Sequence, residues 1–88
     1  MKMNKIAKII NDWDPIGFFP MAPKNEYANE IEKIYSFISS HPETHIQLLA
    51  EEINKIFLEA FERDIYNADM IQCTQIATQI LNSNNTDK

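Results

Sequence analysis

Trp13-Asp14-Pro15-Ile16-Gly17-Phe18-Phe19-Pro20-Met21-Ala22-Pro23 is the stretch that decides how this 88-residue chain folds. It holds the single glycine of the chain and three of its four prolines, so a regular helix cannot run through it. Apolar residues recur at helical spacing on both sides of it. The stretch therefore predicts a long loop that ends one helix and turns the chain back into the next.

The first residues of this loop have the chemistry of a tight turn. The carboxylate of Asp14 can accept hydrogen bonds from amides just downstream, and Pro15 has a fixed φ. Gly17 can adopt a positive φ, which other residues avoid. We therefore predict that Trp13, Asp14, Pro15 and Gly17 form the turn, with Trp13 and Ile16 packed toward the core.

The next large side chains, Phe18, Phe19 and Met21, are too apolar for an ordinary surface loop. Two interpretations stay open. They can fold inward and close one end of the protein, or they can remain exposed as an apolar patch, which on a small protein usually marks an interface. These three residues are the candidate partner-binding residues.

The segments around the loop carry one apolar face each, as expected of two helices. The first helix is predicted over about Lys2 to Asp12. The second is predicted to begin near Lys24–Asn25 and to close at Ser39–Pro42, because the residue before a proline avoids helical geometry. Glu30 lies near its start, where a negative charge suits the helix dipole. The apolar faces are Met3, Ile6, Ile10 and Trp13 in the first helix and Tyr27, Ala28, Ile31, Ile34, Tyr35 and Ile38 in the second.

Two more helices follow at similar spacing. Thr44 is predicted to cap the third helix, with Gln47 reaching back to complete a capping box. Asn67 is predicted to cap the fourth. Their apolar faces are Ile46, Leu49, Ile53, Ile56, Phe57, Ala60 and Phe61 in the third and Met70, Cys73, Ile76, Ala77, Ile80 and Leu81 in the fourth.

These patterns predict an all-α protein, a compact four-helix bundle with a long Pro- and Gly-containing loop between the first two helices. An up-down-up-down order is favoured by the brief links between the later helices. Residues 1–82 are predicted to form a single helical domain, and residues 83–88 a flexible polar tail.

Composition narrows the setting and the partners. The net charge of −5 and the lack of a basic stripe disfavour nucleic acid as a partner. A lone cysteine cannot form an internal disulfide, which suits a reducing compartment. No apolar run has the length of a membrane span or signal peptide. We expect a cytoplasmic protein that has no membrane partner.

The residues that could carry chemistry do not form a recognisable active site. His41-Pro42-Glu43-Thr44-His45 lacks the His-Glu-x-x-His spacing of zinc proteases, and a structural zinc site needs more ligands. Cys73 lies on the apolar face of its helix and is expected to be an inert core thiol. Adjacent carboxylates such as Glu51 and Glu52 point in different directions. We therefore expect no catalytic residue, no metal and no cofactor.

Several segments together resemble the bacterial family called domain of unknown function 1871. They are Asn11-Asp12-Trp13-Asp14-Pro15-Ile16-Gly17, Pro20, Ala22-Pro23-Lys24-Asn25-Glu26-Tyr27 and Glu30-Ile31. Asn25 departs from the acidic residue usual in that family but retains the ability to cap a helix. The resemblance implies a small helical fold in a bacterial cytoplasm. It implies no activity and carries over no catalytic residue.

Three hypotheses about function remain. The first is a non-enzymatic interaction protein that binds an unknown protein partner, or itself, through Phe18, Phe19 and Met21; an immunity- or antitoxin-like role is one version. The second is a small-molecule or metal-binding helical protein. The third is an enzyme that uses Cys73 and a histidine. The second hypothesis would use Tyr27, Tyr35, His41 and His45.

Overall fold

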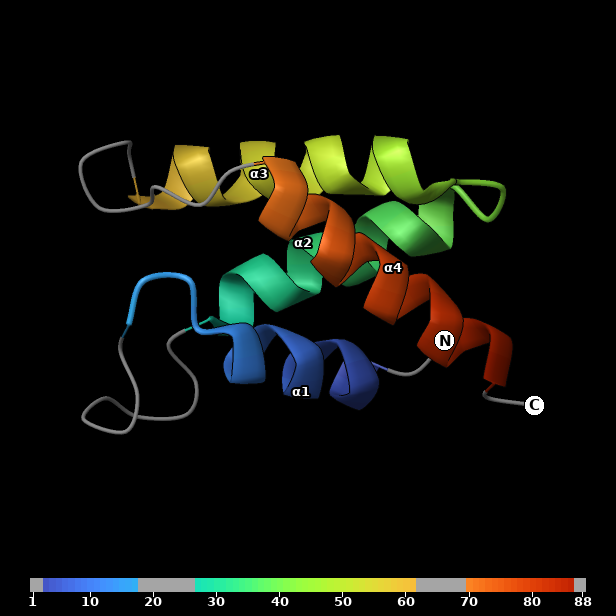
Figure 1. Ribbon diagram of the computed structural model, residues 1–88, viewed down its shortest axis with the longest axis horizontal. Coiled ribbons are helices and arrows are strands. Elements are labelled where there is room, and N and C mark those ends of the chain that lie inside the picture. The colour runs from blue at the N-terminus through green and yellow to red at the C-terminus, as the bar shows by residue number, and fades with distance from the viewer. Residues whose placement is uncertain (1–2, 18–26, 62–69, 87–88) are drawn as a thin grey trace.

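The protein has four helices, separated by the connections that the sequence predicts (Figure 1). A computed structural model describes residues 3–17, 27–61 and 70–86 of the chain. The helices are α1 (Met3–Trp13), α2 (Ala28–Ser40), α3 (Ile46–Phe61) and α4 (Met70–Thr86). The fold is the predicted all-α four-helix bundle, and α1 lies within one residue of its predicted bounds.

Each helix packs against its neighbours in the chain, and α1 also packs against α4, which closes the bundle. α1 and α3 run in one direction and α2 and α4 return, with α4 crossing the others obliquely (Figure 1). The radius of gyration of 12.2 Å matches the value of about 12 Å expected for a compact chain of this length. The predicted up-down-up-down order is therefore confirmed.

The core forms from most of the apolar faces that the sequence spacing marked, but Met3, Ile46 and Met70, at the starts of their helices, are exposed. Isoleucine dominates it, and the restricted rotamers of this β-branched residue favour one well-defined packing. The buried hydrophobic residues are Ile6, Ile10, Tyr27, Ile31, Ile34, Ile38, Leu49, Ala50, Ile53, Ile56, Phe57, Cys73, Ile76, Ala77 and Ile80.

One end of the bundle holds a cluster of aromatic rings. Phe57 lies at its centre, with ring centroids 5.4 Å from Trp13 and 5.9 Å from both Tyr27 and Phe61. The Trp13 and Tyr27 rings meet Phe57 edge to face, a geometry that the charge distribution of aromatic rings favours. We call this the aromatic end; here α1 ends, α2 begins and α3 ends.

The start of α2 differs from the prediction. The helix begins at Ala28, later than Lys24–Asn25, and Tyr27 has a non-helical backbone with φ −101° and ψ 14°. The side chain of Tyr27 reaches back to the turn after α1, which accounts for its exclusion from the helix. Asn25 itself lies outside the described residues, as does the predicted cap Asn67.

The predicted capping box of α3 is wrong by one residue. The Thr44 amide donates to the His41 carbonyl at 2.9 Å, closing a turn, so the first helical carbonyl belongs to His45. His45 Nδ1 accepts a long hydrogen bond from the Leu48 amide at 3.5 Å. Gln47 donates forward to Glu51 at 3.3 Å rather than reaching back. The Thr44 hydroxyl oxygen is buried without a hydrogen-bond partner.

The last helix is longer than the apolar pattern indicated. α4 continues through Thr86, beyond the expected boundary at residue 82. No glycine or proline follows Leu81, so the backbone can keep its helical hydrogen bonds after the apolar face ends.

Replacing Phe57 by Ala tests the importance of the aromatic end. Phe57 is fully buried among three rings, so the variant loses about 3–5 kcal/mol of unfolding free energy. Leu48→Ala on the same helix is the control, because Leu48 is 47% exposed and its loss stays within about 0.5 kcal/mol. Urea denaturation followed by circular dichroism measures both, and equal losses would contradict the assignment.

Candidate functional site

The turn after α1 is built around a left-handed residue, Asp14, with φ 47°. Its amide donates to the Ile10 carbonyl at 2.9 Å, the hydrogen bond of a left-handed helix cap. Aspartate tolerates this backbone better than most residues. The Gly17 amide then donates to the Asp14 carbonyl at 3.1 Å, which closes a four-residue turn with Pro15 in its second position.

Gly17 is required for its backbone and not for its size. Its φ of +85° lies in the left-handed region, and a Cβ added there would meet nothing within 4 Å. The prediction of a positive φ at Gly17 is confirmed. Trp13 and Ile16 are partly buried and pack against the core, also as predicted.

The side chain of Tyr27 joins this turn to the start of α2. Its hydroxyl donates to Asp14 Oδ1 at 2.5 Å and accepts the Ile16 amide at 3.1 Å. We call this pair of hydrogen bonds the turn clamp. The sequence placed Tyr27 on the apolar face of its helix but carried no signal for the contact with Asp14.

The environment of Tyr27 strongly disfavours its charged form. Burial of the ring is the largest cause, and the hydrogen bond to the Asp14 carboxylate adds to it. Together they raise the pKa of Tyr27 well above the ordinary value for tyrosine. The hydroxyl therefore keeps its proton and stays a donor to Asp14 throughout the neutral range.

The candidate partner-binding residues Phe18, Phe19 and Met21 lie outside the described residues. What the structure describes are the residues that flank their segment, Gly17 and Tyr27. Gly17 closes the turn after α1, and Tyr27 forms the turn clamp on that turn. Both residues lie at the aromatic end.

The start of α4 adds exposed apolar side chains at the same end. Met70 is 40% exposed and Ile71 is 69% exposed. The neighbouring Gln72 accepts a long hydrogen bond from the Trp13 indole at 3.4 Å, which places this part of α4 beside the turn. We call Met70 and Ile71 the α4 apolar edge.

The two histidines serve the turn between α2 and α3. The His41 ring stacks on Phe37, with centroids 4.4 Å apart, and its Nδ1 lies 2.9 Å from the Phe37 carbonyl oxygen. His45 caps α3. Among the described residues there is no group of three or more side chains that could hold a metal ion.

The four residues proposed for ligand binding do not converge. Tyr27 and His41 flank opposite ends of α2, about 20 Å apart along a helix of this length. Tyr27 is fully buried and its hydroxyl takes part in the turn clamp, whereas His41 and His45 are exposed.

The lone thiol, Cys73, is fully buried, as predicted for a core residue. Its Sγ lies 3.8 Å from Asn54 Oδ1 across the contact of α3 with α4. Reactive cysteines are accessible to solvent, whereas the Cys73 side chain is fully buried.

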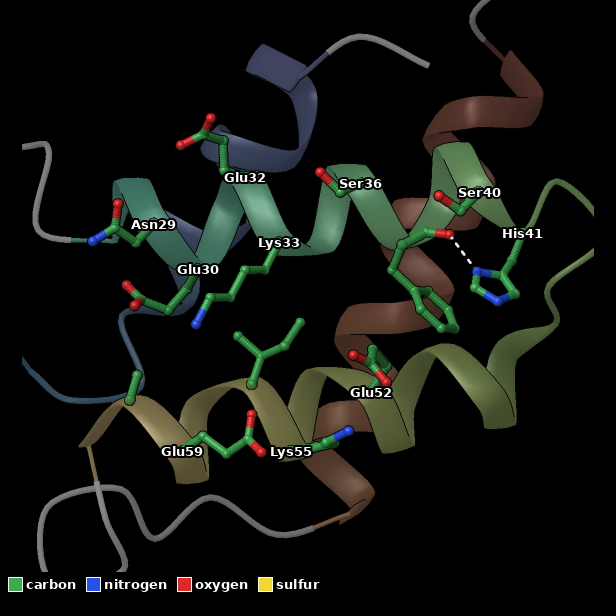
Figure 2. A pocket seen from close by; sticks show the side chains of 13 residues that line it. Asn29, Glu30, Glu32, Lys33, Ser36, Ser40, His41, Glu52, Lys55 and Glu59 are labelled. Atoms are coloured by element: carbon green, nitrogen blue, oxygen red, sulfur yellow. Dashed lines mark hydrogen bonds between the residues drawn. The ribbon is translucent and has the colours of Figure 1, made fainter.

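A groove of about 850 Å³ runs between α2 and α3, and sequence reasoning missed it. Figure 2 shows charged side chains from both helices along it, among them Glu30, Lys33 and Glu59. Glu30 is only 6% exposed. The signal was present, because Glu30 follows Tyr27 by three positions and precedes Ile34 by four, which places it on the buried face.

These features define a small all-α protein, a four-helix bundle with a clamped turn after its first helix. A family model described as "Domain of unknown function (DUF1871)" matches residues 5–88. The chain therefore belongs to this family, whose description names no activity. Neither the search of curated proteins nor that of solved structures found a match. No helix among the described residues is long and apolar enough to cross a membrane.

Removing one oxygen atom tests the turn clamp. Tyr27→Phe keeps the ring but loses the hydroxyl that holds Asp14 and the Ile16 amide, so we expect a loss of about 1–3 kcal/mol. Tyr35→Phe on the same helix is the matched control and should change stability by less than about 0.5 kcal/mol. Urea denaturation at neutral pH measures the free energy of unfolding of both variants. If Tyr27→Phe unfolds with the same free energy as the wild type, the clamp is not a stabilising contact.

The raised pKa of Tyr27 predicts a loss of stability in alkali. Because the pKa of Tyr27 is higher in the folded chain than in the unfolded chain, its protonated form favours folding. This contribution to the free energy of unfolding has its full value below about pH 10. Above that pH the unfolded chain ionises first, and the contribution falls by about 1.4 kcal/mol for each pH unit up to the folded pKa. The measurement is the difference in unfolding free energy between the wild type and Tyr27→Phe from pH 8 to about pH 11. A difference that stays constant over this range would contradict the prediction.

Proposed function

We propose that this protein is a non-enzymatic interaction module that binds a protein partner, or a second copy of itself, through its aromatic end. One observation carries the proposal. The α4 apolar edge stands exposed beside Trp13, at the end where the Phe18, Phe19 and Met21 segment is attached.

Burial and geometry support this choice of surface. Ile71 is the most exposed of the large hydrophobic side chains described, and its exposure has no benefit for the isolated fold. Hydrogen bonds join both Gly17 and Tyr27 to Asp14, so the two residues that flank the apolar segment are tied to the same turn. Preorganised contacts lower the entropy that binding must overcome.

Charge and composition support the class of partner. With a net charge of −5, a basic protein surface is favoured over a nucleic-acid backbone. An immunity- or antitoxin-like role is the version in which the partner is a toxin. The setting that accompanies the proposal is the cytoplasm of a bacterium, where a lone thiol such as Cys73 stays reduced.

The experiment compares apolar substitutions at the two ends of the bundle. Ile71→Ser and the double variant Phe18→Ser/Phe19→Ser alter the proposed surface. Leu48→Ser, at the start of α3, replaces an equally apolar exposed residue at the opposite end. Circular dichroism first confirms that each variant is folded.

Crosslinking in cells followed by mass spectrometry then identifies partners, and light scattering gives the oligomeric mass. We expect the variants of the aromatic end to lose a partner, or the self-association, by about tenfold or more, as for anchors at interfaces. Leu48→Ser should behave as the wild type does. The proposal fails if all four proteins have the same partners and the same oligomeric mass.

A further inference from the structure

One carboxylate oxygen in the groove between α2 and α3 is buried without a hydrogen-bond partner. Glu30 is 6% exposed, and its Oε1 is buried and makes no hydrogen bond. Figure 2 shows its carboxylate pointing into the space between the two helices. Buried carboxylates are costly unless a cation or several hydrogen-bond donors compensate them, so this atom calls for a partner.

A lysine in the same groove does not supply that partner. Lys33 lies one turn further along α2 and reaches into the same groove (Figure 2). Among the described residues, no ion pair joins it to Glu30. Glu30 lies in the first turn of α2, where the helix dipole stabilises a negative charge. The dipole does not, however, supply a hydrogen bond to the buried oxygen.

The rest of the groove indicates the chemistry of a ligand. Apart from Glu32, which points away from α3, three glutamates and two lysines line it, so its net charge is negative and favours a cation. Phe37, Ile56 and Ala60 add an apolar lining. A divalent metal ion needs more oxygen ligands than converge here, since no group of three ligating side chains occurs in the described part of the chain.

We propose that the groove binds an organic cation, with a guanidinium or alkylammonium head on Glu30 and a hydrocarbon stem along Ile56 and Ala60. Such a ligand matches both parts of the lining, because lysine- and arginine-like chains bury the stem and keep the charged head paired. A guanidinium suits a carboxylate best, because its donors form a planar fork. The source is either a free amine or an arginine side chain of another protein. The groove reaches the aromatic end at Glu30 and Ala60 but shares no lining residue with the cluster of aromatic rings, and neither proposal depends on the other.

The test titrates the full chain with two cations and a neutral match, followed by amide chemical shifts in NMR. The probes are agmatine, an acetylated Gly-Arg-Gly amide and the same peptide with citrulline, which has the shape of arginine without its charge. We expect saturable shifts along Asn29–His41 and Glu52–Ala60 with the cationic probes and none with citrulline. Tighter binding of agmatine assigns the source as a free amine, and tighter binding of the peptide assigns it as a protein side chain.

Three variants locate the binding on Glu30. Glu30→Gln keeps the shape and removes the charge, so the Kd should rise about tenfold or more, as for the loss of a charged hydrogen-bond partner. Glu32→Gln removes an equal charge from a side chain that points away from α3 (Figure 2) and should change the Kd by less than about twofold. Lys33→Gln removes a competing cation and should lower the Kd.

Two sets of results would overturn the proposal. The first is the absence of saturable shifts with either cation at millimolar concentration. The second is equal weakening by Glu30→Gln and Glu32→Gln, which would mean that the acidic surface attracts cations without a site. Because Lys33→Gln alters only an exposed side chain, its expected gain tests the proposal even if Glu30→Gln perturbs the fold.

Discussion

The hydroxyl of Tyr27 is the contact on which the arrangement of the first two helices depends. The turn after α1 is partly buried, and its backbone amides need hydrogen-bond partners. Tyr27 supplies one for the Ile16 amide while donating to the Asp14 carboxylate, and its ring packs on Phe57 in the core. One side chain therefore joins the polar turn to the apolar interior, and α2 can begin only where this reach ends.

The aromatic end follows from this contact. With Tyr27 drawn toward the turn, its ring meets Phe57 and Phe61, and Trp13 covers Phe57 from α1. The start of α4 then lies beside Trp13, and Ile71 faces solvent. In this way an aromatic core and an exposed apolar edge occupy the same end of the bundle, the surface that we propose for a protein partner.

The groove between α2 and α3 contains an unfavourably buried atom, in contrast to the favourable packing of rings at the aromatic end. Here the helices place a carboxylate oxygen on a buried face without a hydrogen-bond partner, at a cost to the fold. A buried polar atom without a protein partner is compensated by an ordered water, an ion or a ligand, and the proposed organic cation is one such ligand. The two proposed sites thus use different physics: burial of apolar surface at the aromatic end, and charge pairing in the groove.

The sequence by itself determined the four helices, the bundle, the turn at Asp14–Gly17 and the burial of Cys73. These depend on local spacing and backbone preferences, which act within a few residues. Only the tertiary structure decided that Tyr27 clamps Asp14, that His45 rather than Thr44 caps α3, and that Glu30 faces a groove. Tyr27 and Asp14 are 13 residues apart, and no periodicity encodes a contact between a turn and the next helix. The cap depends on the turn closed between Thr44 and His41, which no helical periodicity encodes, and the groove depends on how α2 lies against α3.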